Sequence, residues 1–198
     1  MRGKRLTVNH GKVFGKLTCL GSSSKANGYL LTNGNVSLLI DCGVPWDDIQ
    51  KATSHNPSTI QFCLISHSHK DHCRSVKEVL KAGIDIYTSQ STIDALNLSG
   101  HRVHAIEPLV PFAVEDYCIM AFPLQHDVEN FGFLIQHRTE GRLIFLTDSY
   151  YSKYKFTDPN YIMVECNYCL DILQQNVADG LVPEALKNRI LQSHFSLE

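Results

Sequence analysis

The sequence predicts one α/β domain of the α+β kind, in which each half of the chain builds a sheet and helices are interspersed. Three observations support this fold class. The length of 198 residues suits a single domain that buries roughly 70% of its unfolded surface. Short apolar runs typical of strands recur through both halves, and helical patterns separate some of them. No linker and no repeat with a period of about 20–50 residues divides the chain.

Composition and charge exclude several classes of protein. The chain is 43% apolar and 19% charged, with a formal net charge of −2, which argues against disorder and against a broad cationic surface for duplex nucleic acid. The apolar stretches are too short to span a membrane, and the N-terminus lacks the hydrophobic region of a signal peptide. The seven cysteines lack the spacing of a small secreted domain. We therefore expect a cytoplasmic protein with reduced thiols, and neither a membrane nor a long nucleic acid as its favoured partner.

The first residues of the chain differ from the rest. Residues 1–16 include Arg2, Lys4, Arg5, Lys12 and Lys16 and show little hydrophobic periodicity. We interpret residues 1–16 as a basic N-terminal extension that packs loosely against a domain spanning residues 17–198.

The elements of the first half follow from apolar runs and the turn residues between them. Asn33-Gly34 lies between two apolar runs and predicts a tight hairpin. In order, we expect a strand, a loop of small residues, two hairpin strands, a buried strand, a helix and another strand: 17–20, 21–24, 29–31, 36–40, 62–65, 76–80 and 84–87.

The second half of the chain also consists of apolar runs separated by turn residues. Four apolar runs predict strands, a turn at Glu140-Gly141 separates two of them, and two helices follow. Pro183 indicates the start of the last helix, because proline suits a helical first turn. The predicted strands are 117–122, 131–135, 143–146 and 161–165, and the first of the two helices is 170–176.

The strongest chemical signal follows the buried strand at 62–65. Ser66-His67-Ser68-His69-Lys70-Asp71-His72 places four potential metal ligands in one loop. In extended backbone alternate residues face one side, so His67 and His69 can converge on one cation. Asp71 and His72, past the bend, can then face a neighbouring cation. Neutral imidazoles and a carboxylate suit zinc, and iron or manganese would also fit.

Further ligand types follow other predicted strands. His126 comes after the strand at 117–122, Asp148 ends the strand at 143–146, and His194 follows the last helix. Loops beyond strand ends are where functional sites are usually built. We therefore expect these side chains to join the histidine-rich loop.

With these residues the chain resembles the metallo-β-lactamase fold superfamily, whose HxHxDH loop is matched by His67, His69, Asp71 and His72. Asp41-Cys42-Gly43, His126 and Asp148 follow the order of that superfamily. Four segments are similar to a phage-encoded branch that includes the anti-Pycsar cyclic-nucleotide phosphodiesterases and neighbours ribonuclease Z: 124–127, 147–151, 164–168 and 193–198.

The resemblance implies an αββα sandwich and a site with two divalent metal ions, zinc or alternatively manganese. It assigns His67, His69 and His126 to one metal, Asp71 and His72 to the other, and Asp148 to both. Related enzymes supply a last ligand from a final C-terminal strand, and we expect this strand to be absent because the sequence ends at Glu198. His194 then either protonates the leaving group or fills the gap as a ligand. Asp71 is expected to orient the nucleophile as well as to bind metal.

Two segments are candidates for substrate binding. Ser23 and Asn27 lie among small residues whose backbone N–H groups can approach a phosphate, although tight-turn packing explains these residues nearly as well. Tyr150, Tyr151 and Lys153 directly follow Asp148, so the aromatic rings can stack on a base and the lysine can meet a phosphate. An amphipathic surface loop is the alternative interpretation of this second segment.

The resemblance implies a dinuclear phosphodiesterase that hydrolyses cyclic mononucleotides, in phage counter-defence and in the host cytoplasm if the gene is carried by a phage. We expect a homodimer, since a second copy can cover the sheet edge left by the missing strand. Three alternatives remain open. They are an RNA or DNA nuclease of the same fold, a thioester or lactone hydrolase, and a non-catalytic nucleotide-binding metal module.

Overall fold

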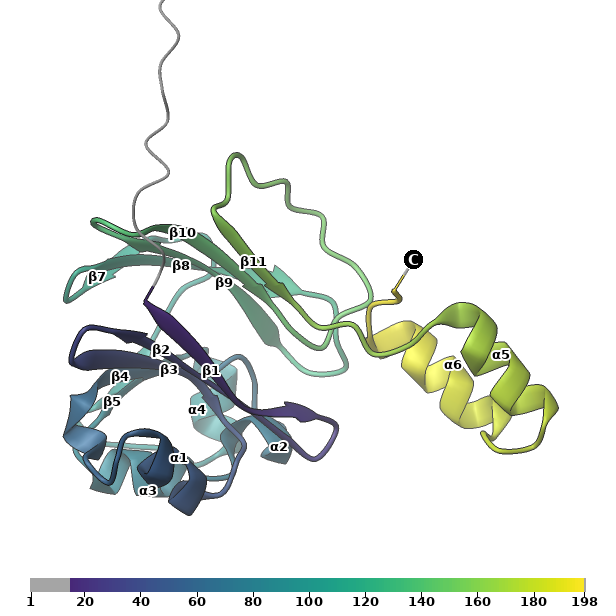
Figure 1. Ribbon diagram of the computed structural model, residues 1–198, viewed down its shortest axis with the longest axis horizontal. Coiled ribbons are helices and arrows are strands. Elements are labelled where there is room, and N and C mark those ends of the chain that lie inside the picture. Colours follow the sequence, from purple (N-terminus) through teal and green to yellow (C-terminus); the bar gives the residue numbers. More distant parts are fainter. Residues whose placement is uncertain (1–14, 198) are drawn as a thin grey trace, which may run out of the picture.

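Two β-sheets pack face to face in the computed structural model, which describes residues 15–197 (Figure 1). The predicted basic extension over residues 1–16 therefore lies outside the described residues, apart from its last two positions. None of the described helices is long and apolar enough to cross a membrane.

The first sheet has six strands in sequence order and carries helices on its outer face (Figure 1). The first three strands are antiparallel, and the third to the sixth are parallel. The strands are β1 (Lys16–Ser23), β2 (Ala26–Asn33), β3 (Val36–Cys42), β4 (Ile60–Leu64), β5 (Asp85–Thr88) and β6 (Val103–Ala105). The helices are α1 (Trp46–Ala52), the 3-10 turn η1 (Pro57–Thr59), α2 (Lys70–Cys73), α3 (Val76–Lys81) and α4 (Gln90–Ala95).

Apolar runs in the central strands of this sheet are buried on both faces. In β3, Leu38 and Ile40 face the second sheet, whereas Leu39 points to the helices. This follows from the pleat, because successive side chains of a strand point to opposite faces. Unbroken apolar runs such as those of β3 and β4 therefore belong to strands that have a layer on each side.

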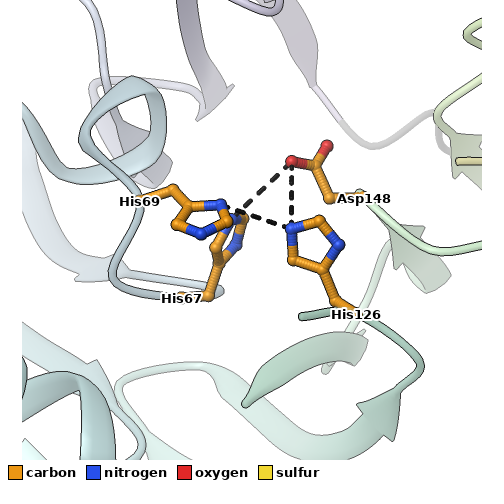
Figure 2. Close-up of side chains that lie close together, drawn as sticks. All are labelled: His67, His69, His126 and Asp148. Atoms are coloured by element: carbon orange, nitrogen blue, oxygen red, sulfur yellow. Dashed lines mark hydrogen bonds and ion pairs between the residues drawn. The ribbon is translucent and has the colours of Figure 1, made fainter. Parts of the chain in front are cut away.

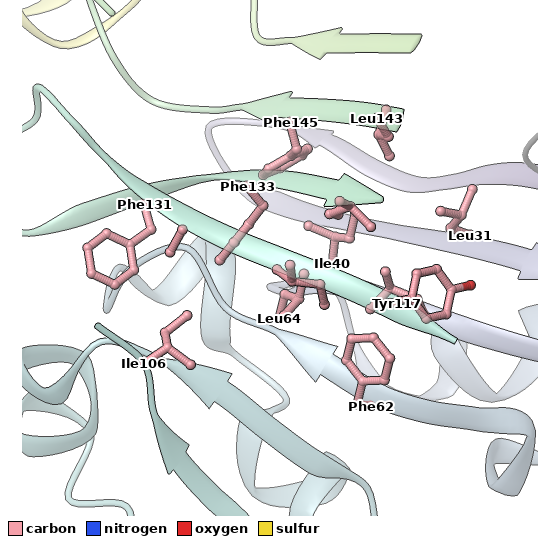
Figure 3. Packing of buried hydrophobic residues seen from close by; sticks show 14 residues of the cluster. Leu31, Ile40, Phe62, Leu64, Ile106, Tyr117, Phe131, Phe133, Leu143 and Phe145 are labelled. Atoms are coloured by element: carbon pink, nitrogen blue, oxygen red, sulfur yellow. The ribbon is translucent and has the colours of Figure 1, made fainter. Parts of the chain in front are cut away.

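The second sheet has five strands in the order β11-β10-β9-β8-β7. Its strands are antiparallel except for β10 and β11, which run parallel. The strands are β7 (Phe112–Val114), β8 (Tyr117–Leu124), β9 (Asn130–His137), β10 (Gly141–Leu146) and β11 (Tyr161–Val164). Phe133 and Phe145 of this sheet meet Phe62 and Leu64 of the first sheet in the core between them (Figure 3).

The outer face of the second sheet is covered by a loop. Phe122 and Ile144 point away from the first sheet and pack against Tyr154 and Phe156. The ring centroids of Phe122 and Phe156 are 4.8 Å apart. The segment between β10 and β11 therefore covers the apolar outer face of this sheet, as helices cover the outer face of the first sheet.

The last two helices, α5 (Leu170–Ala178) and α6 (Glu184–Ser193), form a hairpin that extends from the end of the sheets (Figure 1). The chain enters and leaves this hairpin at one place. Tyr168 and Ser196 form a parallel bridge, and the N–H of Leu197 donates to the carbonyl of Tyr168 at 2.8 Å. The helical hairpin is thus attached to the sheets through two adjacent segments.

The predicted fold class is confirmed, because two mixed sheets pack together, with helices on the outer face of the first sheet and the α5–α6 hairpin at their end. The predicted loop at 21–24 is wrong. β1 continues to Ser23 because Ser22 and Ser23 pair with Asn27 and Ala26 across a turn at Ser24-Lys25. The predicted strand at 117–122 extends through Pro123 to Leu124. Pro183 lies at the N-terminal cap of α6 and not inside its first turn. The prediction missed the short elements α1, η1, α2, α4, β6 and β7.

Candidate metal centre

The histidine-rich segment runs from the end of β4 into α2, so Asp71 and His72 lie in this short helix and not in a loop as predicted. His67 and His72 are fully buried, while His69 and Asp71 are partly exposed. The ring centroid of His67 is 4.7 Å from that of His69 and 4.2 Å from that of His72. The backbone is extended at His69 and turns into α2 immediately after it, so one short segment presents two pairs of side chains.

The second sheet contributes His126 after β8 and Asp148 after β10 (Figure 2). Asp148 Oδ2 lies 3.2 Å from His72 Nε2, 3.7 Å from His67 Nε2 and 3.8 Å from His126 Nε2. His126 Nε2 lies 3.3 Å from His69 Nδ1. Asp148 is therefore the point at which donors from both sheets meet.

Besides a group with Glu165 and His194, the donor atoms form two overlapping groups that share Asp148. His67, His69, His126 and Asp148 form one group, and Asp71, His72 and Asp148 form the other, with the ligand atoms of each group within 4.8 Å of one another. The structure thus brings together all the side chains that the sequence suggested as ligands. Such a His/Asp set suits a borderline divalent cation.

The chemistry of His67 and His126 fits a cation. His67 Nε2 is buried and has no hydrogen-bond partner among the described residues. Burial, followed by the influence of His72, lowers the pKa of His67 to about 2, and burial also lowers the pKa of His126. Both imidazoles are therefore neutral and keep a lone pair, which is the form that binds metal.

Carboxylates concentrate negative charge around His72. Burial lowers its pKa, but the charge of Asp41 and the hydrogen bonds to Asp148, Asp41 and Asp71 outweigh burial and raise it well above the ordinary value. Burial raises the pKa of Asp148, but its hydrogen bond to His72 and the neighbouring imidazoles keep it well below the usual range. An ionised Asp148 next to this cluster attracts positive charge, which a divalent cation supplies.

Asp41 supports the site through His72 and Ser66, whereas the sequence placed it only in the order of the superfamily and predicted no role for it. Its carboxylate lies 2.8 Å from His72 Nδ1 and accepts hydrogen bonds from the backbone N–H and the hydroxyl of Ser66. A carboxylate on the far nitrogen of a ligand imidazole fixes its tautomer and orientation. The signal available was a single acidic residue near the end of the apolar strand β3.

Two further contacts hold the loop in place. The Asn27 amide donates to Asp71 Oδ2 at 3.2 Å and to the Ser23 carbonyl at 2.9 Å, and it lies 2.9 Å from His72 Nε2. A Cβ atom at Gly43 would lie 1.6 Å from the carbonyl oxygen of Asp71. Only glycine allows β3 and α2 to approach this closely.

An open groove of about 710 Å³ lies over the two ligand groups. Ser22, Ser23 and Asn27 line one side, and Glu165, Arg189 and His194 line the other. Ser23 and Asn27, the predicted phosphate-cradle residues, therefore do border the groove, but the Asn27 amide is turned toward Asp71 and His72. Asp127 adds a carboxylate 3.1 Å from His126 Nε2 that was not anticipated.

His194 and Glu165 form a pair in this groove. Their side chains approach to 2.7 Å between Nδ1 and Oε1, and donor atoms of both lie within 4.8 Å of one from Asp148. Burial lowers the pKa of His194, but the neighbouring carboxylate of Glu165 raises it above its ordinary value. His194 is therefore suited to carry a proton in the groove.

The three residues predicted after Asp148 lie in different environments. Tyr150 lines a second hollow of about 720 Å³. Tyr151 is exposed and borders neither hollow among the described residues. The Lys153 ammonium lies 5.4 Å from the ring centroid of Tyr154, and Lys153 borders neither hollow.

Residues 37–169 match the family described as the beta-lactamase superfamily domain. No curated protein matches the sequence significantly. Among solved structures, the chain is similar to the metallo-beta-lactamase fold protein YhfI from Bacillus subtilis, with a TM-score of 0.63 and 23% identity over 81% of this chain and 71% of that chain. It is also similar to human tRNase Z, short form, with a TM-score of 0.59 and 19% identity over 91% and 92% of the two chains. A Cronobacter sakazakii metallo-beta-lactamase with a HARLDQ motif has a TM-score of 0.52 and 15% identity over 68% and 62%.

Proposed function

Because the chain belongs to the beta-lactamase superfamily, we propose that it is a metal-dependent hydrolase that cleaves phosphodiesters, with cyclic mononucleotides as its substrates. The observation that carries this proposal is the pair of ligand groups that share Asp148 beneath an open groove. A site with two cations at one carboxylate favours an anionic substrate, because bound cations are usually the largest local charges in a site.

The residues divide into two sets of ligands. His67, His69, His126 and Asp148 would hold one divalent cation, and Asp71, His72 and Asp148 would hold a second. Zinc suits these donors best, and manganese is the alternative. When bound, such ions polarise the phosphoryl oxygens and stabilise the charge that develops on them.

The remaining steps belong to side chains of the chain itself. Asp71 holds its carboxylate toward the groove, supported by the Asn27 amide, and orients the attacking water. His194, protonated through its pairing with Glu165, donates a proton to the departing alkoxide oxygen. General acid catalysis of this kind contributes typically about 10²- to 10⁴-fold.

The size of the groove supports a small substrate. Its volume of about 710 Å³ lies within the range of roughly 300–1,000 Å³ that is usual for small-molecule sites. The formal net charge of −2 gives no extended positive surface for a polynucleotide. Similarity of the ligand-bearing segments to the anti-Pycsar branch supports cyclic mononucleotides as the specific class.

The purified protein should hydrolyse one or more of cyclic CMP, UMP, AMP and GMP, and a chelator should abolish the reaction. Asp148→Asn keeps the shape of the side chain but removes its charge. We expect it to lower metal content and to reduce kcat by more than the roughly 10- to 100-fold that loss of an outer hydrogen-bond partner costs. Asp171→Asn, an exposed position of α5, is the matched control and should change neither. Absence of turnover with all four nucleotides would contradict the proposal.

The alternatives give different results in the same assay. An RNA or DNA nuclease would cleave oligonucleotides with a steep dependence on salt. A thioester or lactone hydrolase would turn over those neutral substrates. A non-catalytic module would bind nucleotide in a calorimeter without forming product. Elemental analysis of the metal content of each preparation shows whether both ligand groups are filled.

We also propose that the protein forms a homodimer. β11 ends its sheet, and within the described residues it pairs only with β10. Ile162 and Val164 on this strand are 61% and 52% exposed. An exposed end strand with apolar side chains favours pairing with another chain. Sedimentation should give twice the monomer mass, and a charged residue in place of Ile162 should restore the monomer.

A further inference from the structure

The second hollow adjoins the groove over the ligand groups. Both are lined by His126, Arg189 and Ser193, so they meet along one wall. The second hollow has a volume of about 720 Å³ and is lined mostly by α6, with Tyr150 among its other lining residues. A small substrate whose phosphate lies at the ligand groups can therefore extend past Arg189 into this space.

One face of α6 is turned to the hollow. Its residues Ala185, Asn188, Arg189 and Gln192 follow the spacing that places side chains on the same side of a helix. The side chains of Asn188, Arg189 and Gln192 make no hydrogen bond or ion pair with another residue in the part of the chain that the structure describes. Their polar groups are therefore available to a ligand.

Tyr150 gives the hollow an aromatic ring. Tyr150 is 48% exposed, and hydrogen bonds of the preceding residue hold its backbone. The Ser149 hydroxyl donates to the carbonyl of Tyr151 at 2.9 Å and accepts from the N–H of Gln125 at 3.1 Å. The position of Tyr150 next to the Asp148 loop is therefore fixed by the strands that build the site.

This combination of groups is suited to a heterocyclic base. An aromatic ring offers a face on which any base can stack, and carboxamides offer both donors and acceptors for its edge. Arg189 is the one Lys or Arg among the described residues that line either hollow. A guanidinium at the boundary recognises phosphate oxygens in a planar, bidentate way.

We propose that the hollow between Tyr150 and α6 binds the nucleobase of the substrate, and that Arg189 binds its phosphate. This inference rests on the proposed function, because it specifies how the same site selects its substrate. Asn188 and Gln192 distinguish one base from another through hydrogen bonds to its edge.

The test compares a cyclic mononucleotide with bis(p-nitrophenyl) phosphate, a diester that carries no base. Tyr150→Ala and the double variant Asn188→Ala/Gln192→Ala should lower the ratio of kcat/KM for the nucleotide to that for the base-free diester by at least about 5-fold. The double variant should also reduce the preference among the four bases. Gln174→Ala, an exposed glutamine on α5, is the matched control and should leave the ratio unchanged. An unchanged ratio in both hollow variants would overturn the inference.

A binding measurement separates failure of this inference from failure of the proposed function. Calorimetry with nucleoside 5′-monophosphates requires no turnover. If the protein hydrolyses neither diester but binds these nucleotides, and Tyr150→Ala weakens binding by at least about 5-fold, the proposed function fails and the base subsite stands. If the diesters are hydrolysed but Tyr150→Ala binds the monophosphates as tightly as the wild type, the subsite is wrong and the function stands.

Discussion

The two packed sheets and the helical hairpin α5–α6 differ in how completely they bury their apolar side chains. The sheets bury large side chains such as Phe62 and Phe133 completely, whereas the hairpin leaves Ile172 62% and Leu181 73% exposed. Both regions nevertheless contribute to the site. The sheets provide the buried histidines and Asp148, and the hairpin provides Arg189 and His194 at the open side. Most of the candidate ligands are thus buried in the sheets, while Arg189 and His194 lie on an element with more exposed apolar surface.

The largest expected effect tests the difference in stability between these regions. Phe133→Ala removes a ring from the core between the sheets, and we expect a loss of about 3–5 kcal/mol in the free energy of unfolding. Ile172→Ser on the hairpin should change it by no more than about 0.5 kcal/mol. Urea denaturation followed by circular dichroism measures both. Similar losses for the two variants would mean that the hairpin is as tightly packed as the sheets.

The next effect concerns the support of His72 within the sheets. Asp41→Asn preserves the side-chain shape and suits the positive φ of 56° at this position. It removes the charge opposite His72 Nδ1, so we expect metal affinity to fall roughly 10- to 100-fold. Competition with a chromogenic chelator gives the affinity, and Asp47→Asn, an exposed position of α1, serves as control. Unchanged affinity would show that the tautomer of His72 is fixed by other contacts.

The smallest effect lies where the hairpin meets the sheets. Glu165 raises the pKa of His194, so the protonated pair stabilises the fold fully below the unfolded pKa of about 6.5. This contribution is lost as the pH rises through the higher folded pKa. Glu165→Gln should therefore lower stability at acidic pH only, and should move the alkaline limb of the kcat profile to lower pH. A profile that keeps its alkaline limb would exclude His194 as the proton donor.

Much of the fold could be predicted because local pattern and tertiary packing agree. The apolar runs of β3, β4 and β9 are buried, and the predicted hairpin forms, although its turn is Gly34-Asn35 and Asn33 pairs with Val36. The short elements were missed because three residues, as in β6 and β7, cannot show a period. Ser22 and Ser23 became strand through pairing with β2, which outweighs their preference for turns. Pro123 is tolerated because β7 pairs only with residues 117–119 of β8.

The candidate ligands were easier to predict than the residues around them. Three histidines and an aspartate within six positions form a pattern that a solvated loop rarely has. Asp41 and Arg189 carry no such pattern, because each is a single charged residue in an ordinary strand or helix. The relation of Asp41 to His72 arises from a contact between elements that are distant in the sequence, and Arg189 reaches the groove only because α6 packs beside the ligand groups. Such contacts become visible only in three dimensions.

The bridge between Tyr168 and Ser196 has a practical consequence for protein engineering. Since the chain departs and returns at neighbouring points, the helical hairpin between them can change in length without altering the course of the remaining backbone, provided that Arg189 and His194 keep their places in the groove. Libraries that place helical pairs of different length between these anchor points are expected to change substrate selectivity. The candidate metal ligands of the two sheets would keep their positions. Natural diversification by insertion would follow the same route.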